Sequence, residues 1–284
     1  MWVVTGATGQ LGRLVVDSLL ESVPAEQVVA VVRDQDKAAG LAARGVRLRI
    51  ADYDDPATLR GAFAAGDRVL LISGSEVGRR LPQHTAVIDA AREAGVALLA
   101  YTGVLGGPAA DFALADEHKA TEEALLASGL PYVFLRNGWY HENFTAQLGP
   151  VLKVGRVVAA AGEGRVASAS RADYAAAAAA VLTGEGHEGK AYELSGDTAW
   201  SFAEYAAEIS RLSGTEVRYT PVGADEQRAN LLAAGLPEPY AELLVDVDTA
   251  IERGLLAATP GDLSRLIGRP TTPIGDAIAA AIED

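Results

Sequence analysis

Short apolar runs alternate with longer amphipathic or polar stretches through the first half of the chain. The runs are predicted to be strands, and they lie at residues 2–4, 28–32, 46–50, 69–72, 96–102 and 132–135. The stretches between them are predicted to be helices, and they cover residues 11–19, 35–44, 82–94 and 112–128, with a further helix that begins at Asp55-Pro56. Strands that alternate with helices in this way indicate βαβ units. The pattern therefore predicts an α/β fold with a doubly wound parallel sheet.

The rhythm changes after residue 136. A short strand is predicted over residues 155–161, an alanine-rich helix from Asp173 to Leu182, and one more sheet strand over residues 192–194. Ser201 and Glu204 have the spacing of a capping box, which predicts a helix that ends at Gly214. The remainder reads as mainly helical. We expect a dinucleotide-binding Rossmann domain over residues 1–136. Residues 137–284 should form mainly a smaller, helical substrate lobe, from which residues 167–196 return to the sheet.

A glycine-rich turn follows the first strand directly. Gly6 permits a tight turn, Gly9 lets the backbone approach a pyrophosphate, and Gly12 allows close packing of strand and helix. The helix that follows directs its N–H groups and the positive end of its dipole at the anion. Strand, turn and amphipathic helix together predict dinucleotide binding. The predicted contacts come from consecutive residues: Gly6, Ala7, Thr8, Gly9, Gln10 and Leu11.

The residue after the second strand bears on which nicotinamide cofactor is used. NAD sites place an acidic residue there, whereas this chain has Arg33, with Lys37 close behind on the next helix. A guanidinium suits the 2′-phosphate of NADP, so NADP(H) is the favoured cofactor. Alternatively, Arg33 and Lys37 only form surface ion pairs with the neighbouring Asp34 and Asp36. Use of NAD(H) therefore stays open.

Other cofactor contacts are expected where later strands end, because ligands bind at the carboxyl edge of such sheets. Asp52 is placed to accept a hydrogen bond from the adenine amino group. The remaining candidates follow the fourth, fifth and sixth strands, and they are Ser73, Gly74, Ser75, Thr102 and Gly138. The alternative is that these loops only cap neighbouring backbone.

Composition narrows the class of protein. A formal net charge of −14 argues against a nucleic-acid partner, since phosphate contacts need clustered Lys and Arg. The chain has no cysteine, and its four histidines show no metal-ligand spacing, so neither a disulfide nor a metal site is expected. No apolar run of about 18 residues predicts a membrane span, and no signal peptide is recognised. A cytoplasmic protein is expected, and a homo-oligomer stays open.

The fifth helix lacks a pair of residues that ordinary short-chain reductases use. Those enzymes carry Tyr-x-x-x-Lys there, but the places four residues before His118 and Lys119 hold Leu114 and Ala115. The proton-donating tyrosine is therefore missing, although the glycine turn is present.

That combination resembles the NmrA-like atypical short-chain dehydrogenases, and among them the bacterial NADPH-dependent quinone oxidoreductases. The resemblance covers nearly the whole chain. It rests on the glycine turn and on the segments at residues 75–84, 114–118, 135–143, 167–174, 186–190 and 266–272. It implies an NADPH-binding Rossmann domain, a small substrate lobe, and two-electron reduction of quinones without a flavin. In related enzymes the Asn137-Gly-Trp-Tyr140 and Arg171-Ala-Asp-Tyr174 segments line the cleft between the lobes.

A quinone acceptor makes chemical sense of the missing tyrosine. Hydride addition to a quinone gives a phenolate, whose conjugate acid has a pKa of about 10, so a positioned hydrogen-bond donor suffices. Tyr140 and Asn143 are the leading donor candidates, and His118 is a secondary one. The alternative for His118 is a helix histidine bonded to Glu122 one turn later. His84 is expected to be structural or to anchor a loop. Substrate contacts are expected from Trp139, Tyr140, Glu76 and Arg171.

Two other functions stay open at this point. With the same cofactor, a reduced aromatic polyketide quinone could react with O₂, giving net oxygenation. Alternatively, the chain could bind NADP without turnover, as dinucleotide-sensing NmrA-like regulators do. Quinone turnover with and without oxygen separates the three.

Overall fold

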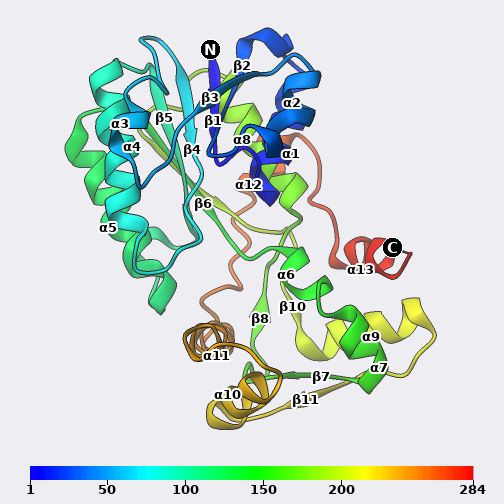
Figure 1. Cartoon of the computed structure of the whole chain (residues 1–284). Helices are drawn as coiled ribbons and strands as arrows, with labels where there is room; N and C mark the ends of the chain where they lie inside the picture. The colour runs from blue at the N-terminus through cyan, green and yellow to red at the C-terminus, as the bar shows by residue number, and fades with distance from the viewer. Residues whose placement is uncertain (284) are drawn as a thin grey trace. The chain divides into compact units, whose positions relative to one another are not determined.

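Seven strands form the main sheet of the computed structural model, which describes residues 1–283 (Figure 1). Their order across the sheet is β3-β2-β1-β4-β5-β6-β9, and every pair from β3 to β6 is parallel. The strands are β1 Trp2–Thr5, β2 Val28–Val32, β3 Arg47–Ile50, β4 Arg68–Leu71, β5 Leu98–Val104, β6 Tyr132–Asn137 and β9 Lys190–Leu194. The predicted doubly wound parallel sheet is confirmed. The prediction that residues 192–194 add a strand to it is also confirmed.

Helices cover both faces of this sheet (Figure 1). On one face α1 packs against α8, and on the other α3 packs against α4, with α5 beside it. These helices are α1 Gln10–Leu20, α2 Ala39–Ala43, α3 Pro56–Leu59, α4 Arg80–Ala94, α5 Ala113–Ser128 and α8 Arg171–Thr183. Asp55 caps α3, as predicted, by accepting a hydrogen bond from the N–H of Ala57. The buried face of the sheet under α4 and α5 is apolar, with Val3, Val69 and Leu99 fully buried.

The predicted helix over residues 35–44 is wrong in its extent. A 3₁₀ turn covers Asp36–Ala38, and only α2 beyond it is α-helical. The Asp34 carboxylate accepts hydrogen bonds from the N–H groups of Asp36 and Lys37, and it thereby favours a turn over a regular helix start.

The chain divides into two compact units. Unit 1 contains residues 1–107, 116–137 and 171–193, and unit 2 contains residues 108–115, 138–170 and 194–284. The helices of unit 2 are α6 His141–Thr145, α7 Leu148–Val154, α9 Phe202–Ser213, α10 Ala224–Ala233, α11 Glu238–Glu252, α12 Asp262–Ile267 and α13 Ile274–Glu283. The capping box at Ser201 and Glu204 is confirmed, with both reciprocal hydrogen bonds present.

Among its described residues, unit 2 also contains four short strands, of which the sequence pattern predicted only the first. β7 Arg156–Ala159, within the strand predicted over residues 155–161, pairs in parallel with β11 Arg218–Pro221. β8 Arg165–Val166 and β10 Trp200–Ser201 form an antiparallel pair. The strand predicted over residues 155–161 is thus confirmed as β7. β8, β10 and β11 are too short to show a clear period of two, so only tertiary pairing identifies them.

Candidate functional site

Two glycines of the turn after β1 are required for different reasons, Gly6 by its backbone conformation and Gly12 by close backbone contacts. Gly6 adopts a φ of +59°, and its carbonyl accepts a hydrogen bond of 2.9 Å from the N–H of Gly9. A Cβ atom added at Gly12 would lie 2.3 Å from the Gly6 oxygen and 2.8 Å from the Cα of Ala7. The backbone itself therefore forms a cradle in front of α1, which suits a pyrophosphate at the positive end of a helix. Ala7 and Leu11 are buried, so they can contribute only backbone to such a contact.

The strand order reverses between β1 and β4, and buried hydroxyl groups hold this point together. The Thr5 hydroxyl donates to the carbonyl of Leu70 at 3.0 Å and accepts from the N–H of Ile72 at 3.1 Å. The Tyr53 hydroxyl in turn donates to Thr5. Burial raises the pKa of Tyr53 above its usual value, so this hydroxyl stays protonated. Ligands bind open α/β sheets where the strand order reverses, and here the glycine turn and the loop after β4 both begin at that point.

The Ser73–Ser75 loop is held by three side chains from two other elements, β5 and α4. The N–H of Ser73 donates to the Thr102 hydroxyl at 2.9 Å. The N–H of Gly74 donates to Nε2 of His84 at 2.9 Å, and its carbonyl accepts from Nε of Arg80 at 2.6 Å. The expectation that His84 anchors a loop is confirmed. The loop thus has a fixed conformation beside the glycine turn.

His84 can hold Gly74 only as a neutral imidazole. Its Nε2 accepts a hydrogen bond from the N–H of Gly74, so Nδ1 carries the ring hydrogen and donates to the Thr121 hydroxyl at 3.0 Å. Burial, assisted by the charge of Arg80, lowers the pKa of His84 to about 4. The contact is therefore intact at neutral pH.

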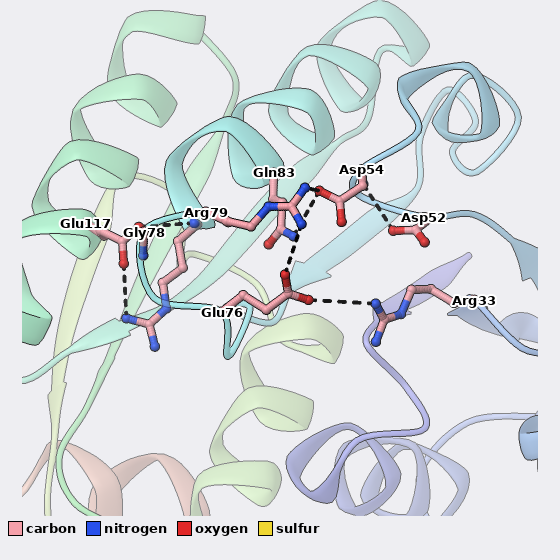
Figure 2. Close-up of polar contacts among 9 residues, drawn as sticks. Arg33, Asp52, Asp54, Glu76, Gly78, Arg79, Gln83 and Glu117 are labelled. Atoms are coloured by element: carbon pink, nitrogen blue, oxygen red, sulfur yellow. Dashed lines mark hydrogen bonds and ion pairs between the residues drawn. The ribbon is translucent and has the colours of Figure 1, made fainter. Parts of the chain in front are cut away.

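A glutamate that the sequence interpretation missed fixes the far end of this loop. One carboxylate oxygen of Glu117 accepts hydrogen bonds of 3.1 Å from the N–H groups of both Gly78 and Arg80 (Figure 2). Its other oxygen lies 3.6 Å from Nη1 of Arg80. Glu117 belongs to the 114–118 segment that carried the family resemblance, but nothing in that segment indicates its distant partners.

Arg33 lies at the end of β2 with its guanidinium largely exposed. Nη1 of Arg33 is 4.0 Å from a carboxylate oxygen of Glu76 in the loop after β4 (Figure 2). Lys37 pairs with Asp34 at 3.8 Å, which is the surface ion pair that the sequence offered as an alternative. Asp52, on the same edge, accepts a hydrogen bond from the N–H of Asp54 at 3.1 Å.

His118 has a different partner from the one predicted. Its Nδ1 lies 2.7 Å from the Tyr101 hydroxyl, whereas Glu122 forms a two-pronged contact of 2.8 and 2.9 Å with Arg136. The predicted bond to Glu122 is wrong because a guanidinium on β6 binds that carboxylate. Burial, with smaller effects from Arg80 and His84, lowers the pKa of His118 to about 3. At neutral pH this imidazole carries no charge.

Trp139, Tyr140 and Asn143 lie together on the segment of unit 2 that follows β6. The N–H of Ala169 donates to the carbonyl of Trp139 at 3.1 Å, and the N–H of His141 donates to the carbonyl of Ala169 at 2.9 Å. Tyr140 is the N-cap residue of α6, and Asn143 lies within that helix. The side chains of Trp139, Tyr140 and Asn143 are all half-buried. At the start of the segment, Gly138 donates to the carbonyl of Leu194 at 2.7 Å.

A buried histidine fixes that segment within unit 2. Nε2 of His141 donates to the carbonyl of Thr272 at 2.9 Å, so its Nδ1 accepts from the Ser168 hydroxyl at 2.8 Å. The Ser168 oxygen also accepts from the indole N–H of Trp200 at 3.0 Å. Four segments that are distant in sequence meet in this chain of hydrogen bonds.

The two other predicted substrate contacts lie in unit 1. Arg171 is the half-buried first residue of α8, and Glu76 is paired with Arg33 and Arg79. Among residues 1–283 the structure contains no cluster of three or more His, Cys, Asp or Glu side chains suited to a metal ion. In the same part of the chain, no helix is both long and apolar enough to cross a membrane.

Comparison with known proteins identifies the family. A family model described as NAD(P)H-binding matches residues 6–185. The chain belongs to this NAD(P)H-binding family. It is 48% identical to quinone oxidoreductase 2 of Escherichia coli K12 over 279 residues, which cover 98% of each chain. The crystal structure of the NADPH-dependent quinone oxidoreductase of E. coli with NADPH matches it with a TM-score of 0.97, over 99% of this chain and 100% of that one.

A second solved structure resembles the chain almost as closely. The triphenylmethane reductase of Citrobacter sp. with NADP(H) is 42% identical, with a TM-score of 0.95 over 99% of this chain and 100% of that one. The predicted family resemblance, the Rossmann fold and the nicotinamide cofactor are confirmed. Within the family, the glycine cradle described above is the feature that fits the cofactor.

Proposed function

We propose that this protein is an NADPH-dependent reductase that transfers hydride to a quinone. The observation that carries the proposal is the 48% identity with quinone oxidoreductase 2 over 98% of both chains. The absence of the Tyr-x-x-x-Lys pair is chemically consistent with this proposal. Hydride addition to a quinone gives a stable phenolate, which does not require a strong proton donor in the site.

The proposed cofactor contacts of unit 1 lie in or directly after strands β1 to β5. The backbone of residues 6–11 would hold the pyrophosphate, Arg33 and Lys37 the 2′-phosphate, and Asp52 the adenine. Ser73, Gly74, Ser75, Thr102 and Gly138 are proposed to contact the nicotinamide ribose. The hydrogen bonds that fix Ser73 and Gly74 support this assignment, because a loop that is already fixed loses little conformational entropy of its own when a ligand binds.

Bound NADPH would supply the hydride, and the protein's own groups would orient the acceptor and stabilise its developing negative charge. Tyr140 and Asn143 are proposed as hydrogen-bond donors to the quinone oxygen, with Trp139 and Arg171 as substrate contacts. Net reduction adds one hydride and one proton, giving NADP⁺ and a hydroquinone. His118 stays the secondary candidate, because its lowered pKa leaves it without an acidic proton at pH 7.

One assay tests the function. Purified protein is mixed with NADPH or NADH and a panel of quinones, and loss of the reduced-nicotinamide absorbance is followed with and without oxygen. Because of the similarity to triphenylmethane reductase, a triphenylmethane dye is included as a second acceptor class. We expect turnover with NADPH that does not depend on oxygen. Tight NADPH binding without turnover would instead favour a regulator, and oxygen uptake in step with NADPH loss would favour net oxygenation.

A matched pair of tyrosine variants tests the proposed donor. Tyr140→Phe should lower kcat by about 100- to 1,000-fold, as loss of one hydrogen-bond donor to developing charge does. Tyr240→Phe is the control, since Tyr240 is an exposed tyrosine on α11. Equal activity of the two variants would remove Tyr140 from the mechanism.

A further inference from the structure

The loop between β4 and α4 is anchored at both ends and exposed in the middle. Its first anchor is Gly74, whose N–H and carbonyl are both bonded to side chains of α4. Its second anchor is Gly78, whose N–H is bonded to Glu117 of α5. Between the anchors Glu76 is exposed, so its carboxylate can change partners without disturbing the core.

Glu76 lies between two guanidinium groups (Figure 2). One of its oxygens is 4.0 Å from Nη1 of Arg33, and the other is 3.5 Å from Nη1 of Arg79. Arg79 is held in place by a second carboxylate, because its Nη2 lies 2.8 Å from Asp54. Gln83 donates to the same Asp54 oxygen at 3.1 Å. Arg79 therefore keeps Glu76 at the end of β2, next to Arg33.

We propose that Glu76 is a specificity-determining residue that competes with the adenosine 2′-phosphate of NADP for Arg33. Without nucleotide, its carboxylate neutralises the Arg33 guanidinium, and the phosphate of NADP displaces it. This inference rests on the proposed function, in which Arg33 binds the 2′-phosphate. It moves Glu76 from the predicted quinone contacts to the adenosine end of the cofactor.

The charges explain why the exchange is feasible. A phosphate is a stronger, bidentate partner for a guanidinium than a carboxylate at 4.0 Å, so the phosphate wins the competition. Glu76 keeps its contact with Arg79 after displacement, so no carboxylate is left unpaired. NAD lacks the 2′-phosphate and gains nothing from displacing Glu76. The Glu76 charge therefore lowers the affinity for NADP and leaves the affinity for NAD unchanged.

Nucleotide binding without any quinone tests the inference. Calorimetric titrations with NADP⁺ and NAD⁺ are compared for the unmodified protein and the Glu76→Gln variant. We expect the Kd for NADP⁺ to fall about threefold, as for removal of one weak exposed charge pair, while the Kd for NAD⁺ stays unchanged. At about 1 M salt the difference should disappear, because the Debye length is then about 3 Å.

Glu26→Gln is the matched control. Glu26 is an exposed glutamate just before β2, at the opposite end of that strand from Arg33, and its substitution makes the same change in net charge. A five-residue strand spans about 17 Å, well beyond the screening length at physiological salt. Glu26→Gln should therefore leave both affinities unchanged. Equal gains from the two variants would mean a general charge effect and would overturn the proposal.

A double variant links the effect to Arg33. Arg33→Gln alone should weaken NADP⁺ binding, and adding Glu76→Gln to it should bring no further change. If Glu76→Gln still raises the affinity for NADP⁺ in the Arg33→Gln protein, the proposal is overturned. Glu76→Ala serves as the second variant, and thermal melting checks that each protein is folded. If the unmodified protein shows no quinone turnover but the variants bind nucleotide as expected, the reductase function is refuted and the role of Glu76 stands. If the protein reduces quinones but the variants do not bind nucleotide as expected, the role of Glu76 is refuted and the reductase function stands.

Discussion

Gly12 shows at the scale of a single residue why the cofactor turn needs its glycines. The position is helical, so backbone conformation alone would accept any residue. What excludes a side chain is the approach of the Gly6 carbonyl to 2.3 Å from the place a Cβ would take. Sequence spacing identified the glycine, and the structure supplies the contact that requires it.

Gly12→Ala should therefore destabilise the protein by about 1–3 kcal/mol through overpacking against backbone, and should weaken nucleotide binding. Gly40→Ala is the control, because Gly40 lies in α2 and a Cβ there meets nothing within 4 Å. Gly40→Ala should raise the free energy of unfolding of the protein by about 0.5–1 kcal/mol, because alanine favours a helix more than glycine does. Urea denaturation measures both, and a neutral Gly12→Ala would show that the turn can relax.

At the scale of elements, a guanidinium on β6 joins three parts of unit 1. Arg136 binds Glu122 of α5 at 2.8 Å and Glu193 of β9 at 2.8 Å. Glu193 also accepts from the N–H of Gly106 at 2.7 Å, in the loop after β5. A Cβ at Gly107 would lie 2.2 Å from the Arg136 Cζ, so this loop closes directly over the guanidinium. The network fixes the end of β6, from which the Gly138–Tyr140 segment continues.

Arg136→Met should lower the free energy of unfolding by about 3 kcal/mol, since it leaves the largely buried Glu122 carboxylate without its cation. Glu193→Gln should lower it by less than about 1 kcal/mol, because that side chain is 31% exposed and its amide oxygen can still accept one of the two hydrogen bonds. Chemical denaturation of both variants tests this order. Equal losses would mean that the contact with Glu193, rather than the burial of Glu122, accounts for the effect of Arg136→Met.

At the scale of the whole molecule, the two units carry buried ionisable groups of opposite sign. In unit 1, burial lowers the pKa values of His84 and His118 to about 4 and about 3. In unit 2, burial raises the pKa of Asp248 to about 6, against hydrogen bonds from Ala160 and Gln227. Burial disfavours the charged form of both kinds of group. The histidines become charged as pH falls, whereas Asp248 becomes charged as pH rises.

The two units should therefore respond oppositely to mild acid. Both histidines bind protons more readily in the unfolded protein, where their pKa is about 6.5. Their contribution to the free energy of unfolding is therefore complete above that pH and is lost as pH falls toward about 4. Unit 1 should lose about 1 kcal/mol per histidine between pH 6.5 and 5.5. Asp248 gains protons more readily folded, so its contribution is lost as pH rises through about 6, and unit 2 should become slightly more stable over the same interval.

Hydrogen exchange, corrected for the intrinsic pH dependence of amide exchange, resolves the two units. Protection of β4 and β5 should fall on acidification, while that of β7 and α11 should not. Asp248→Asn should abolish the gain in unit 2 and leave the loss in unit 1. A uniform response of both units would contradict the assignment.

Much of the fold could be predicted because its signals are local. Alternation of apolar runs and amphipathic stretches marks the strands and helices, and the spacing of Gly6, Gly9 and Gly12 marks the dinucleotide turn. Arg33 could be singled out by its place after the second strand. The failures lie where local signals are too short, as in β11, or where a side chain competes with the helix, as at Asp34.

The sequence by itself determined the α/β class, the glycine turn and the kind of cofactor, because these follow from backbone periodicity and from residues within one βαβ unit. Only the tertiary structure decided the partners of the charged groups. Glu117 reaches Gly78 across 39 residues, Arg136 reaches Glu193 across 57, and Glu76 comes to Arg33 from a different strand. Such pairs have no signature in sequence, because a carboxylate can pair with any cation that the fold brings within reach.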